Sequence, residues 1–267
     1  MNYVLGGGGF IGSHIAKTFS AAVLDLDLRD DPGSKLDMIE SGDWVFQAAH
    51  VGSIDECAKD PAATREVNVR GTMRFFEELK KRSAIPVYFS SNMVFDGSKP
   101  FYSESEIPHP TTEYGRQKRA IEKYLAATFP RYLIIRMTKV YGPKSRSFID
   151  SWLGALKNNQ EIRAADDMWS APLYIADAML ALQHLLADTR SGICHLSGPR
   201  ERTMPEIAQL VAWHVHADQS LIIPISISDL SLIEKRPIHN SLSCDTLQTQ
   251  GYAAPRDIPE ILHTFYT

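Results

Sequence analysis

Long apolar runs, cysteine pairs and an excess of one charge are all missing from this sequence of 267 residues. No stretch approaches the roughly 18 consecutive apolar residues that a membrane-spanning helix requires, so we expect no membrane span. The 28 basic and 32 acidic residues nearly balance, which leaves no polybasic surface for nucleic-acid backbones. The three cysteines lie far apart and outside any cluster with histidine; this pattern predicts neither a disulfide framework nor a metal site.

The N-terminus leads from a few apolar residues directly into glycines, without the basic and apolar regions of a secretory signal. Together with the odd, scattered cysteines, this predicts reduced thiols in a cytoplasmic protein. Hydrophobic residues make up 44% of the chain and charged residues 22%, which is ordinary globular usage and excludes wholesale disorder. No repeat with a period of about 20–50 residues is present, so a solenoid is not expected. The length allows one large domain or two modest ones.

Short apolar runs alternate with helical patterns through the first part of the chain. We expect strands at residues 3–5, 22–26, 44–48, 87–90 and 133–136, and helices at 11–19, 61–81 and 112–129. Runs that are apolar on both faces are typical of a buried parallel sheet. Their alternation with helices predicts an α/β fold with a doubly wound parallel sheet.

The pattern changes after Pro143. Helices are expected at residues 148–157, 174–186 and 204–214, a strand at 193–196, and a β-rich segment at 221–227 that Pro224 restricts to a sheet edge. We therefore expect residues 1–143 to form the main domain. Residues 144–267 would form a smaller mixed cap that binds substrate, with the chain returning to the main sheet near residues 171–198.

A glycine-rich turn joins the first expected strand to the first expected helix. Gly6, Gly9 and Gly12 have GxxGxxG spacing, and Phe10 and Ile11 lie within the turn. Glycine lets the backbone approach a pyrophosphate, whose charge then rests on helix N–H groups. The strand–turn–helix context predicts that residues 1–143 are a Rossmann-type dinucleotide-binding domain. A merely flexible turn is the alternative.

Acidic residues follow the second expected strand. A carboxylate there accepts hydrogen bonds from the adenosine ribose and repels a 2′-phosphate; Asp25 is better placed for this than Asp27. We therefore expect NAD(H) to be favoured over NADP(H), although Arg29 nearby would offer a phosphate a partner. Asp37 and Met38 are candidates for the adenine edge, with the start of a surface helix as the alternative.

Tyr114 and Lys118 lie four residues apart in the helix expected at 112–129 and therefore share one face. The lysine and a nicotinamide cation would lower the pKa of the phenol from its usual ~10, so that Tyr114 can exchange a proton with a carbonyl or alcohol. Ser90 and Ser91 follow a strand, at the edge where open α/β sheets bind ligands. Either hydroxyl could orient that carbonyl, and a strand-ending turn is the alternative.

The sequence resembles the extended short-chain dehydrogenases/reductases and, among them, the dTDP-4-dehydrorhamnose reductase family, over almost its whole length. The resemblance is carried by the turn at residues 6–12, Ala48-Ala49-His50, Asn68-Val69-Arg70-Gly71-Thr72, and segments 90–97, 114–118, 136–143, 172–177, 195–198 and 236–242. It implies Ser91 as the triad hydroxyl, Tyr114 as the acid/base and Lys118 as its partner on the nicotinamide ribose. The residues expected to hold the cofactor are Gly6, Gly9, Phe10, Ile11, Gly12, Asp25, Asp37, Met38, Ala48, Ala49, His50, Ser90, Tyr114 and Lys118. For His50, a polar residue that caps a strand is an equal alternative.

The sequence departs from the family pattern where substrate would bind. Asn92 and Met93 stand where the reductases usually have Asp and Tyr, and Lys139 takes the usual Trp position. In the later loop, Met168, Ser170 and Leu173 replace Gln, Gly and Thr of the family motif. The residues expected to contact substrate are Asn92, Met93, Lys139, Trp169 and Arg236; for Trp169, packing within the cap is the alternative. Lys139, Lys144, Arg146 and Arg236 are cations near the sheet edge that could meet a diphosphate or be solvated surface charges.

Three functions follow from these patterns. The sequence favours an NAD(P)-dependent oxidoreductase that reduces the keto group of a nucleotide-linked 4-keto-6-deoxy sugar, with the proton coming from Tyr114. An NAD-retaining nucleotide-sugar epimerase or dehydratase is the first alternative. A non-catalytic NAD(P)-binding regulatory module, suggested by the altered substrate residues, is the second. We expect no metal and no nucleic-acid partner, and homodimerisation through helices 61–81 and 112–129 stays open.

Overall fold

The computed structural model describes residues 1–145 and 147–265. Its centre is a six-stranded sheet in the order β10-β5-β4-β3-β1-β2, in which every neighbouring pair is parallel. The expected doubly wound parallel sheet is therefore confirmed. Its strands are β1 (Asn2–Leu5), β2 (Ala22–Leu24), β3 (Trp44–Gln47), β4 (Ile85–Ser91), β5 (Leu133–Met137) and β10 (Gly192–Leu196).

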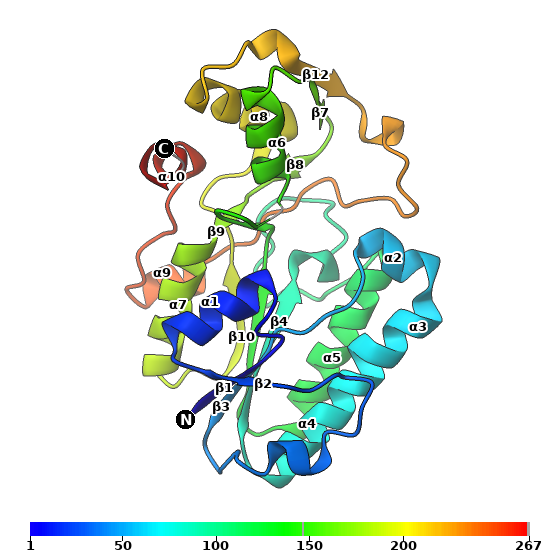
Figure 1. Ribbon diagram of the computed structural model, residues 1–267, viewed down its shortest axis with the longest axis vertical. Coiled ribbons are helices and arrows are strands. Elements are labelled where there is room, and N and C mark those ends of the chain that lie inside the picture. Colours follow the sequence, from blue (N-terminus) through cyan, green and yellow to red (C-terminus); the bar gives the residue numbers. More distant parts are fainter. Residues whose placement is uncertain (146, 266–267) are drawn as a thin grey trace.

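Helices cover both faces of this sheet (Figure 1). The first strand alternates between them: Val4 packs in one apolar core, while Tyr3 and Leu5 pack in the other. One face carries α1 (Phe10–Thr18) and α7 (Ile175–Ala187), which contact each other. The other carries α3 (Pro61–Arg65), the π-helical segment η2 (Glu66–Gly71), α4 (Thr72–Lys81) and α5 (Glu113–Thr128). The long helix expected at 61–81 is thus present, but its middle turn is widened.

The second half of the chain forms small sheets and helices above the carboxyl edge of the large sheet (Figure 1). Helices α6 (Phe148–Lys157) and α8 (Met204–His214) have the expected bounds and pack together. Three two-stranded sheets accompany them: β6 (Val140–Tyr141) with β9 (Leu173–Tyr174), β7 (Ile162–Ala165) with β12 (Ile222–Ile225), and β8 (Trp169–Ser170) with β11 (Arg202–Thr203). Pro224 lies in β12, on an edge as expected.

The remaining elements are short. They are η1 (Gly33–Leu36), α2 (Ile54–Lys59), η3 (Asn92–Val94), η4 (Gln219–Leu221), η5 (Ile227–Asp229), α9 (Asp245–Thr249) and α10 (Ile258–Phe265). The sequence analysis did not anticipate α2, although Ser53 and Glu56 form a capping box at its start. Among the described residues, no helix is long and apolar enough to cross a membrane.

The two parts of the molecule are joined by more than one crossing of the chain. β10 pairs with β5 as the last strand of the large sheet, so the second half contributes a strand and α7 to the main layer. Farther on, Arg256 pairs with Asp177 of α7, and Asp257 pairs with Arg202 at 2.6 Å. These contacts hold the cap against the sheet.

Candidate active site

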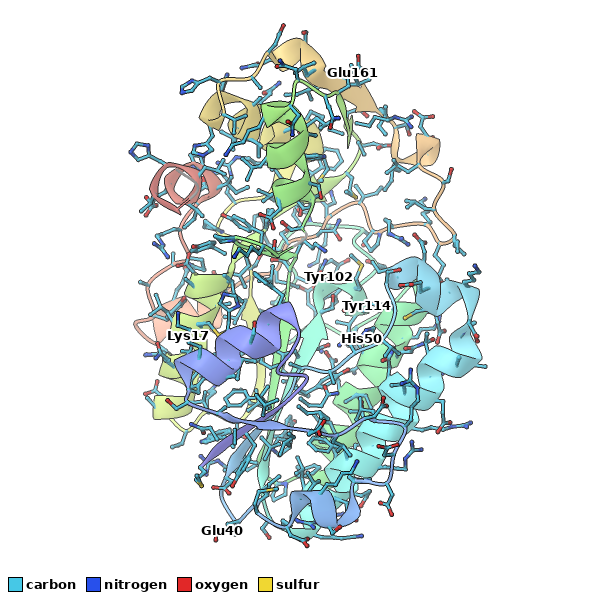
Figure 2. All side chains as sticks on the ribbon, viewed as in Figure 1. Lys17, Glu40, His50, Tyr102, Tyr114 and Glu161 are labelled. Atoms are coloured by element: carbon cyan, nitrogen blue, oxygen red, sulfur yellow. The ribbon has the colours of Figure 1, made fainter. Side chains whose placement is uncertain are left out.

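A cleft of about 700 Å³ lies between the carboxyl edge of the sheet and the cap. Tyr114 and His50 lie close together at this junction (Figure 2). On the sheet side the cleft is lined by Gly9, Phe10, Ile11, Gly12, Gln47, Ala48, His50, Phe89, Ser90, Ser91, Asn92, Met93, Tyr114, Lys118, Met137, Thr138 and Lys139. The cap and the connecting loops contribute further lining residues described below.

The glycine turn has the shape that a dinucleotide requires. Gly6 has φ +87°, and a Cβ on Gly12 would lie 2.1 Å from the carbonyl oxygen of Gly6; only glycine therefore lets α1 begin so close to the strand. No side chain caps the first turn of α1 at Gly9, so its N–H groups are free for an anion. Nothing lies within 4 Å of the Cβ position at Gly8. These features fit a pyrophosphate.

Asp25 directly follows β2 beside this turn. Leu24 and Leu5, the residues before Asp25 and Gly6, are register partners, so the carboxylate and the turn share one edge of the sheet. Asp25 is exposed and has no partner among residues 1–145 and 147–265. Arg29 donates to Asp27 at 2.8 Å from both its backbone and its guanidinium.

Asp37 and Met38 lie at the opposite edge of the sheet. Asp37 pairs with Arg82 at 2.9 Å, shortly before β4 begins, and Tyr3 donates its hydroxyl to the carbonyl of Met38. Glu40, close by in sequence, lies at the far end of the molecule from Tyr114 (Figure 2). The expectation that Asp37 and Met38 contact the adenine is therefore wrong, because η1 turns the chain back beneath the amino ends of the strands.

The serine, tyrosine and lysine expected to act together do meet in the cleft. Ser91 is the last residue of β4, and Tyr114 and Lys118 come from the first two turns of α5. The Lys118 ammonium donates to the carbonyl of Phe89 at 2.9 Å and lies 5.6 Å from the centroid of the Tyr114 ring. On the other side, the His50 ring lies 5.0 Å from that of Tyr114.

Burial decides how these groups titrate. It raises the pKa of Tyr114 to about 12, and a hydrogen bond with Ser91 acts in the opposite direction. In the protein alone this shift is opposite in direction to the depression expected from Lys118 together with a nicotinamide cation. Burial also lowers the pKa of Lys118 to about 8. The pKa of His50 falls to about 2 through burial and the nearby Lys118, so its imidazole is neutral at physiological pH.

The two candidate serines have different partners. Ser90 lines the cleft, but its hydroxyl is taken up by Glu122 of α5, to which it donates at 2.6 Å. Glu122 also accepts two hydrogen bonds from Arg136 of β5, both at 2.8 Å, within a core where neither side chain is more than 1% exposed. Ser91 also lines the cleft, and its hydroxyl interacts with Tyr114 and donates to the neighbouring Asn92 side chain at 3.2 Å. Ser91 is therefore the serine beside the phenol.

The first turn of α5 packs tightly against the turn after β4. A Cβ on Gly115 would lie 2.0 Å from the carbonyl oxygen of Met93, so any side chain here would push the helix away. Thr112 caps the helix by accepting from the N–H of Gly115 at 3.1 Å. This close approach places Tyr114 beside Ser91.

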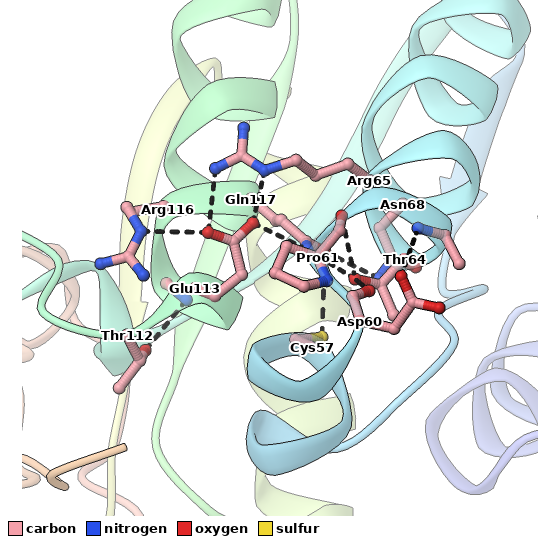
Figure 3. A network of polar contacts seen from close by, with 12 residues as sticks. Cys57, Asp60, Pro61, Thr64, Arg65, Asn68, Thr112, Glu113, Arg116 and Gln117 are labelled. Carbon is pink, nitrogen blue, oxygen red and sulfur yellow. Dashed lines mark hydrogen bonds and ion pairs between the residues drawn. The ribbon is translucent and has the colours of Figure 1, made fainter. Parts of the chain in front are cut away.

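A network that the sequence analysis missed holds α5 from behind (Figure 3). Arg65 of α3 donates two hydrogen bonds, at 2.5 and 2.9 Å, to the buried carboxylate of Glu113. Gln117 donates to Glu113 at 3.0 Å and to Thr64 at 2.9 Å. Because Glu113 and Gln117 flank Tyr114 on the helix, these contacts fix the rotation of the first turn of α5.

Asn68 extends this network to the loop after β3. It donates to Gln117 at 2.9 Å and exchanges hydrogen bonds with both the N–H and the carbonyl of Val51, also at 2.9 Å. Asn68 lies in the π-helical segment η2, the kind of widened turn that often occurs at functional sites. In the same loop, Ala48 and His50 line the cleft and Ala49 packs under Gly6.

The residues expected to contact substrate are only partly brought together. Asn92, Met93, Lys139 and Arg236 line the cleft. Asn92 donates to Asn240 at 3.0 Å. The Lys139 side chain is exposed in the cleft and has no partner in the described part of the chain. Partial desolvation by the surrounding protein lowers the pKa of its ammonium group. The guanidinium of Arg236 is bound by Asp55 at 2.6 Å.

Two other expected residues lie outside the cleft lining. The ring of Trp169 stacks on His239 at a centroid distance of 5.2 Å and does not line the cleft. The alternative interpretation, packing within the cap, therefore describes Trp169 better than contact with substrate. Lys144 is exposed in the loop after β6 and does not line the cleft. Arg146 lies outside the described residues.

The cap side of the cleft is mainly apolar, and the sequence analysis did not anticipate most of it. Besides Ser145, Ser170, Arg236 and Asn240, its lining consists of Val140, Phe148, Met168, Met204, Ile227, Leu230 and Leu232, and Gly52, Ser53 and Ile54 close one end. These residues come from segments far apart in the sequence, so no local pattern marks them. Within the described residues, no group of three or more side chains could hold a metal ion.

Comparison with known proteins places these features in a family. A family model described as the RmlD substrate binding domain matches residues 2–267. The dTDP-4-dehydrorhamnose reductase of Sinorhizobium fredii is 30% identical over 80% of this chain and 76% of its own, and that of Aggregatibacter actinomycetemcomitans is 26% identical over 95% and 94%. The crystal structure of a dTDP-4-dehydrorhamnose reductase from Bacillus anthracis in complex with NADP aligns with a TM-score of 0.90 at 21% identity, covering 99% of this chain and 98% of that one.

Proposed function

The chain belongs to the RmlD substrate-binding-domain family, and from this premise we propose that it is a nicotinamide-dependent reductase acting on the keto group of a nucleotide-linked sugar. The observation that carries the proposal is the meeting of Tyr114, Ser91 and Lys118 in one cleft with an open glycine turn. The two curated relatives named above are reductases of a dTDP-linked keto sugar. The presence of Ser91, Tyr114 and Lys118 in one cleft of a chain from this family supports the same class of reaction, the reduction of a sugar keto group.

Tyr114 is the proton donor in this proposal. With a pKa raised to about 12, its phenol stays protonated at neutral pH and can give its proton to the oxygen of a carbonyl as that carbonyl is reduced. The Ser91 hydroxyl, bonded to Tyr114, holds the carbonyl oxygen in place. The Lys118 ammonium, close to the phenol ring, stabilises the phenolate that remains.

A nicotinamide cofactor bound in the cleft supplies the hydride for the reduction. The glycine turn would hold its pyrophosphate, because that turn leaves helix N–H groups free and the space beside Gly8 is open. Lys118, Ala48 and His50 would face its nicotinamide half. We propose NAD(H) over NADP(H), since Asp25 is unpaired at the ribose position and Arg29 is bound to Asp27; the relative from Bacillus anthracis was crystallised with NADP.

The substrate half of the cleft supports a related but altered sugar nucleotide. Asn92, Met93 and Lys139 adjoin Ser91 at the ends of β4 and β5 and would contact the sugar. Lys139 is the cation best placed for an anionic group, because Arg236 is already bound to Asp55. The apolar cap side would cover the uncharged parts of the substrate.

Replacing the phenol tests the proposed function. Tyr114→Phe removes the proton donor and should lower reductase turnover by about 10²–10⁴-fold, while the dissociation constant for cofactor stays within about twofold of wild type because the glycine turn is untouched. Turnover is measured as NADH or NADPH oxidation with a dTDP-linked 4-keto-6-deoxyhexose. Tyr124→Phe is the matched control, because Tyr124 lies on the same helix but bonds Glu77 outside the cleft.

Two results would contradict the proposal. Unchanged turnover in Tyr114→Phe would remove the phenol from the mechanism. Tightly bound NAD in the purified protein, with sugar-nucleotide conversion but no net cofactor oxidation, would instead support the epimerase.

A further inference from the structure

One segment of the cap crosses the cleft and reaches the helices beyond it. Residues 226–240, which we call the strap, have no helix or strand after η5. At its start, Ser226 and the N–H of Ile227 bond Asp167 of the cap at 2.8 and 2.6 Å. Farther on, Leu230 and Leu232 line the cleft. The strap therefore forms part of the wall of the cleft on the cap side.

The strap is fastened to α2 by Asp55. This carboxylate accepts from Arg236 at 2.6 Å and from the N–H of Ile233 at 3.1 Å, and the hydrogen bond from Arg236 is the main cause of its lowered pKa. The Arg236 and Asp55 side chains are 13% and 31% exposed, so water can reach the pair. Such a contact can open and re-form as ligands exchange.

A second fastening lies on α5, one residue before Tyr114. The N–H of Glu113 donates to both carboxylate oxygens of Glu234, at 3.0 and 2.9 Å, and Arg116 donates to Glu234 at 3.0 Å. The first N–H groups of a helix have no partner within the helix. Glu234 therefore supplies, from 121 residues away in the sequence, the acceptor and the negative charge that this helix end requires.

We propose that Glu234 is a positioning residue for Tyr114, which couples closure of the strap over the cleft to the placement of the first turn of α5. When the strap is closed, Glu234 holds the backbone on one side of Tyr114 and Arg116 on the other. When the strap leaves, the N–H of Glu113 loses its acceptor and Arg116 loses its ion pair with Glu234. Both lie next to Gly115, whose close contact with the carbonyl of Met93 sets the position of this turn. The coupling rests on the proposed function only in assigning the proton transfer to Tyr114.

Hydrogen–deuterium exchange of the full chain tests this coupling without any turnover. In Glu234→Ala, amides of residues 230–240 and of 113–116 should both exchange at least about tenfold faster than in wild type, while amides of β4 keep their protection. Glu234→Gln retains an oxygen that can accept from Glu113, so it should restore most of the protection of 113–116. Asp229→Ala is the matched control: Asp229 bonds Ser226 within the strap and does not touch α5.

A second variant loosens the strap without touching α5. Arg236→Met breaks the fastening to Asp55, and faster exchange should then appear both at 230–240 and at 113–116. If the strap loosens in Arg236→Met or Glu234→Ala while residues 113–116 exchange as in wild type, the coupling is overturned. Faster exchange at 113–116 in Asp229→Ala while residues 230–240 keep their protection would overturn it as well.

Activity provides a third measurement, and it distinguishes this inference from the proposed function. Glu234→Ala should lower kcat about tenfold with Glu234→Gln close to wild type, and leave the KM for cofactor unchanged. An equal loss in both variants would contradict a positioning role. Absence of reductase turnover in the wild type would refute the proposed function but leave the exchange results to decide the coupling.

Discussion

The two sides of the cleft are built in different ways. On the sheet side, polar groups lie at the ends of strands and on one helix, and each is bonded to a neighbour: Lys118 to Phe89, Ser91 to Tyr114, Ser90 to Glu122. On the cap side, the lining is mainly apolar and comes from the starts of helices, such as Phe148 of α6, and from loops, such as Leu230. The sheet side is therefore held by hydrogen bonds between named partners, whereas the cap side is held mainly by apolar packing.

The two sides also differ in what stabilises them. Beneath the sheet side, the Glu122–Arg136 pair is buried and fully bonded. The contact that closes the cap over the cleft, Arg236 with Asp55, is partly exposed. A buried pair is costly to break because the remaining charge has no solvent, whereas an exposed pair is replaced by water.

The largest expected effect comes from breaking the buried pair. Glu122→Ala leaves the buried Arg136 guanidinium without its counter-charge and the Ser90 hydroxyl without its acceptor, and should lower the free energy of unfolding by roughly 3–5 kcal/mol. Asp55→Ala, which removes the strap's pair, should cost about 1 kcal/mol or less. Urea denaturation of both variants measures the difference. Equal losses would show that the two sides are stabilised alike.

The second largest effect is expected in the pH dependence of turnover, which should follow the titration of Lys118 on the sheet side. The pKa of Lys118 is about 8 and that of Tyr114 about 12, so the lysine loses its proton first as pH rises, while the phenol keeps its own. If the ammonium is required, kcat is constant below pH 8 and falls about tenfold per pH unit above it.

Lys118→Arg is the control for this profile. A guanidinium stays charged over the same range, so the alkaline limb should disappear even if overall turnover is lower. A limb that remains near pH 8 in this variant would assign the titration to another group, of which Lys139 is the nearest candidate in the cleft.

The smallest effect is expected on the cap side. Leu230→Ala removes apolar contact with substrate and should raise the KM for the sugar nucleotide about fivefold with kcat within about twofold, because such contact is made equally in the ground state and the transition state. Leu180→Ala is the control, since Leu180 is 56% exposed on α7 and does not line the cleft. A fall in kcat at constant KM would mean that the cap side also acts on the reacting atoms.

The sheet side was largely predictable, because its signals are local. The GxxGxxG turn, the pair Tyr114 and Lys118, and the serines after β4 all lie in short continuous segments whose position at a strand end is itself encoded nearby. The prediction for Asp37 and Met38 failed for a related reason. Their distance from β2 in the sequence does not reveal that η1 carries them to the opposite edge of the sheet.

The cap side and the supports of the site were not predictable in this way. Glu234 meets Glu113 across 121 residues, and Asn92 meets Asn240 across 148, and no spacing rule connects such pairs. Trp169 matched a family position in the substrate loop but packs on His239. The direction of the Tyr114 pKa shift was also missed, because it depends on how deeply the phenol is buried.

The sequence by itself therefore determined the parallel sheet, the glycine turn after its first strand and the identity of the serine, tyrosine and lysine that meet in the cleft, since strand periodicity, glycine geometry and side-chain chemistry are properties of short segments. Only the tertiary structure decided which serine faces Tyr114, which charges are already paired, and how the cap closes on the first turn of α5. Those outcomes depend on burial and on contacts between distant segments, and both arise only when the chain has folded.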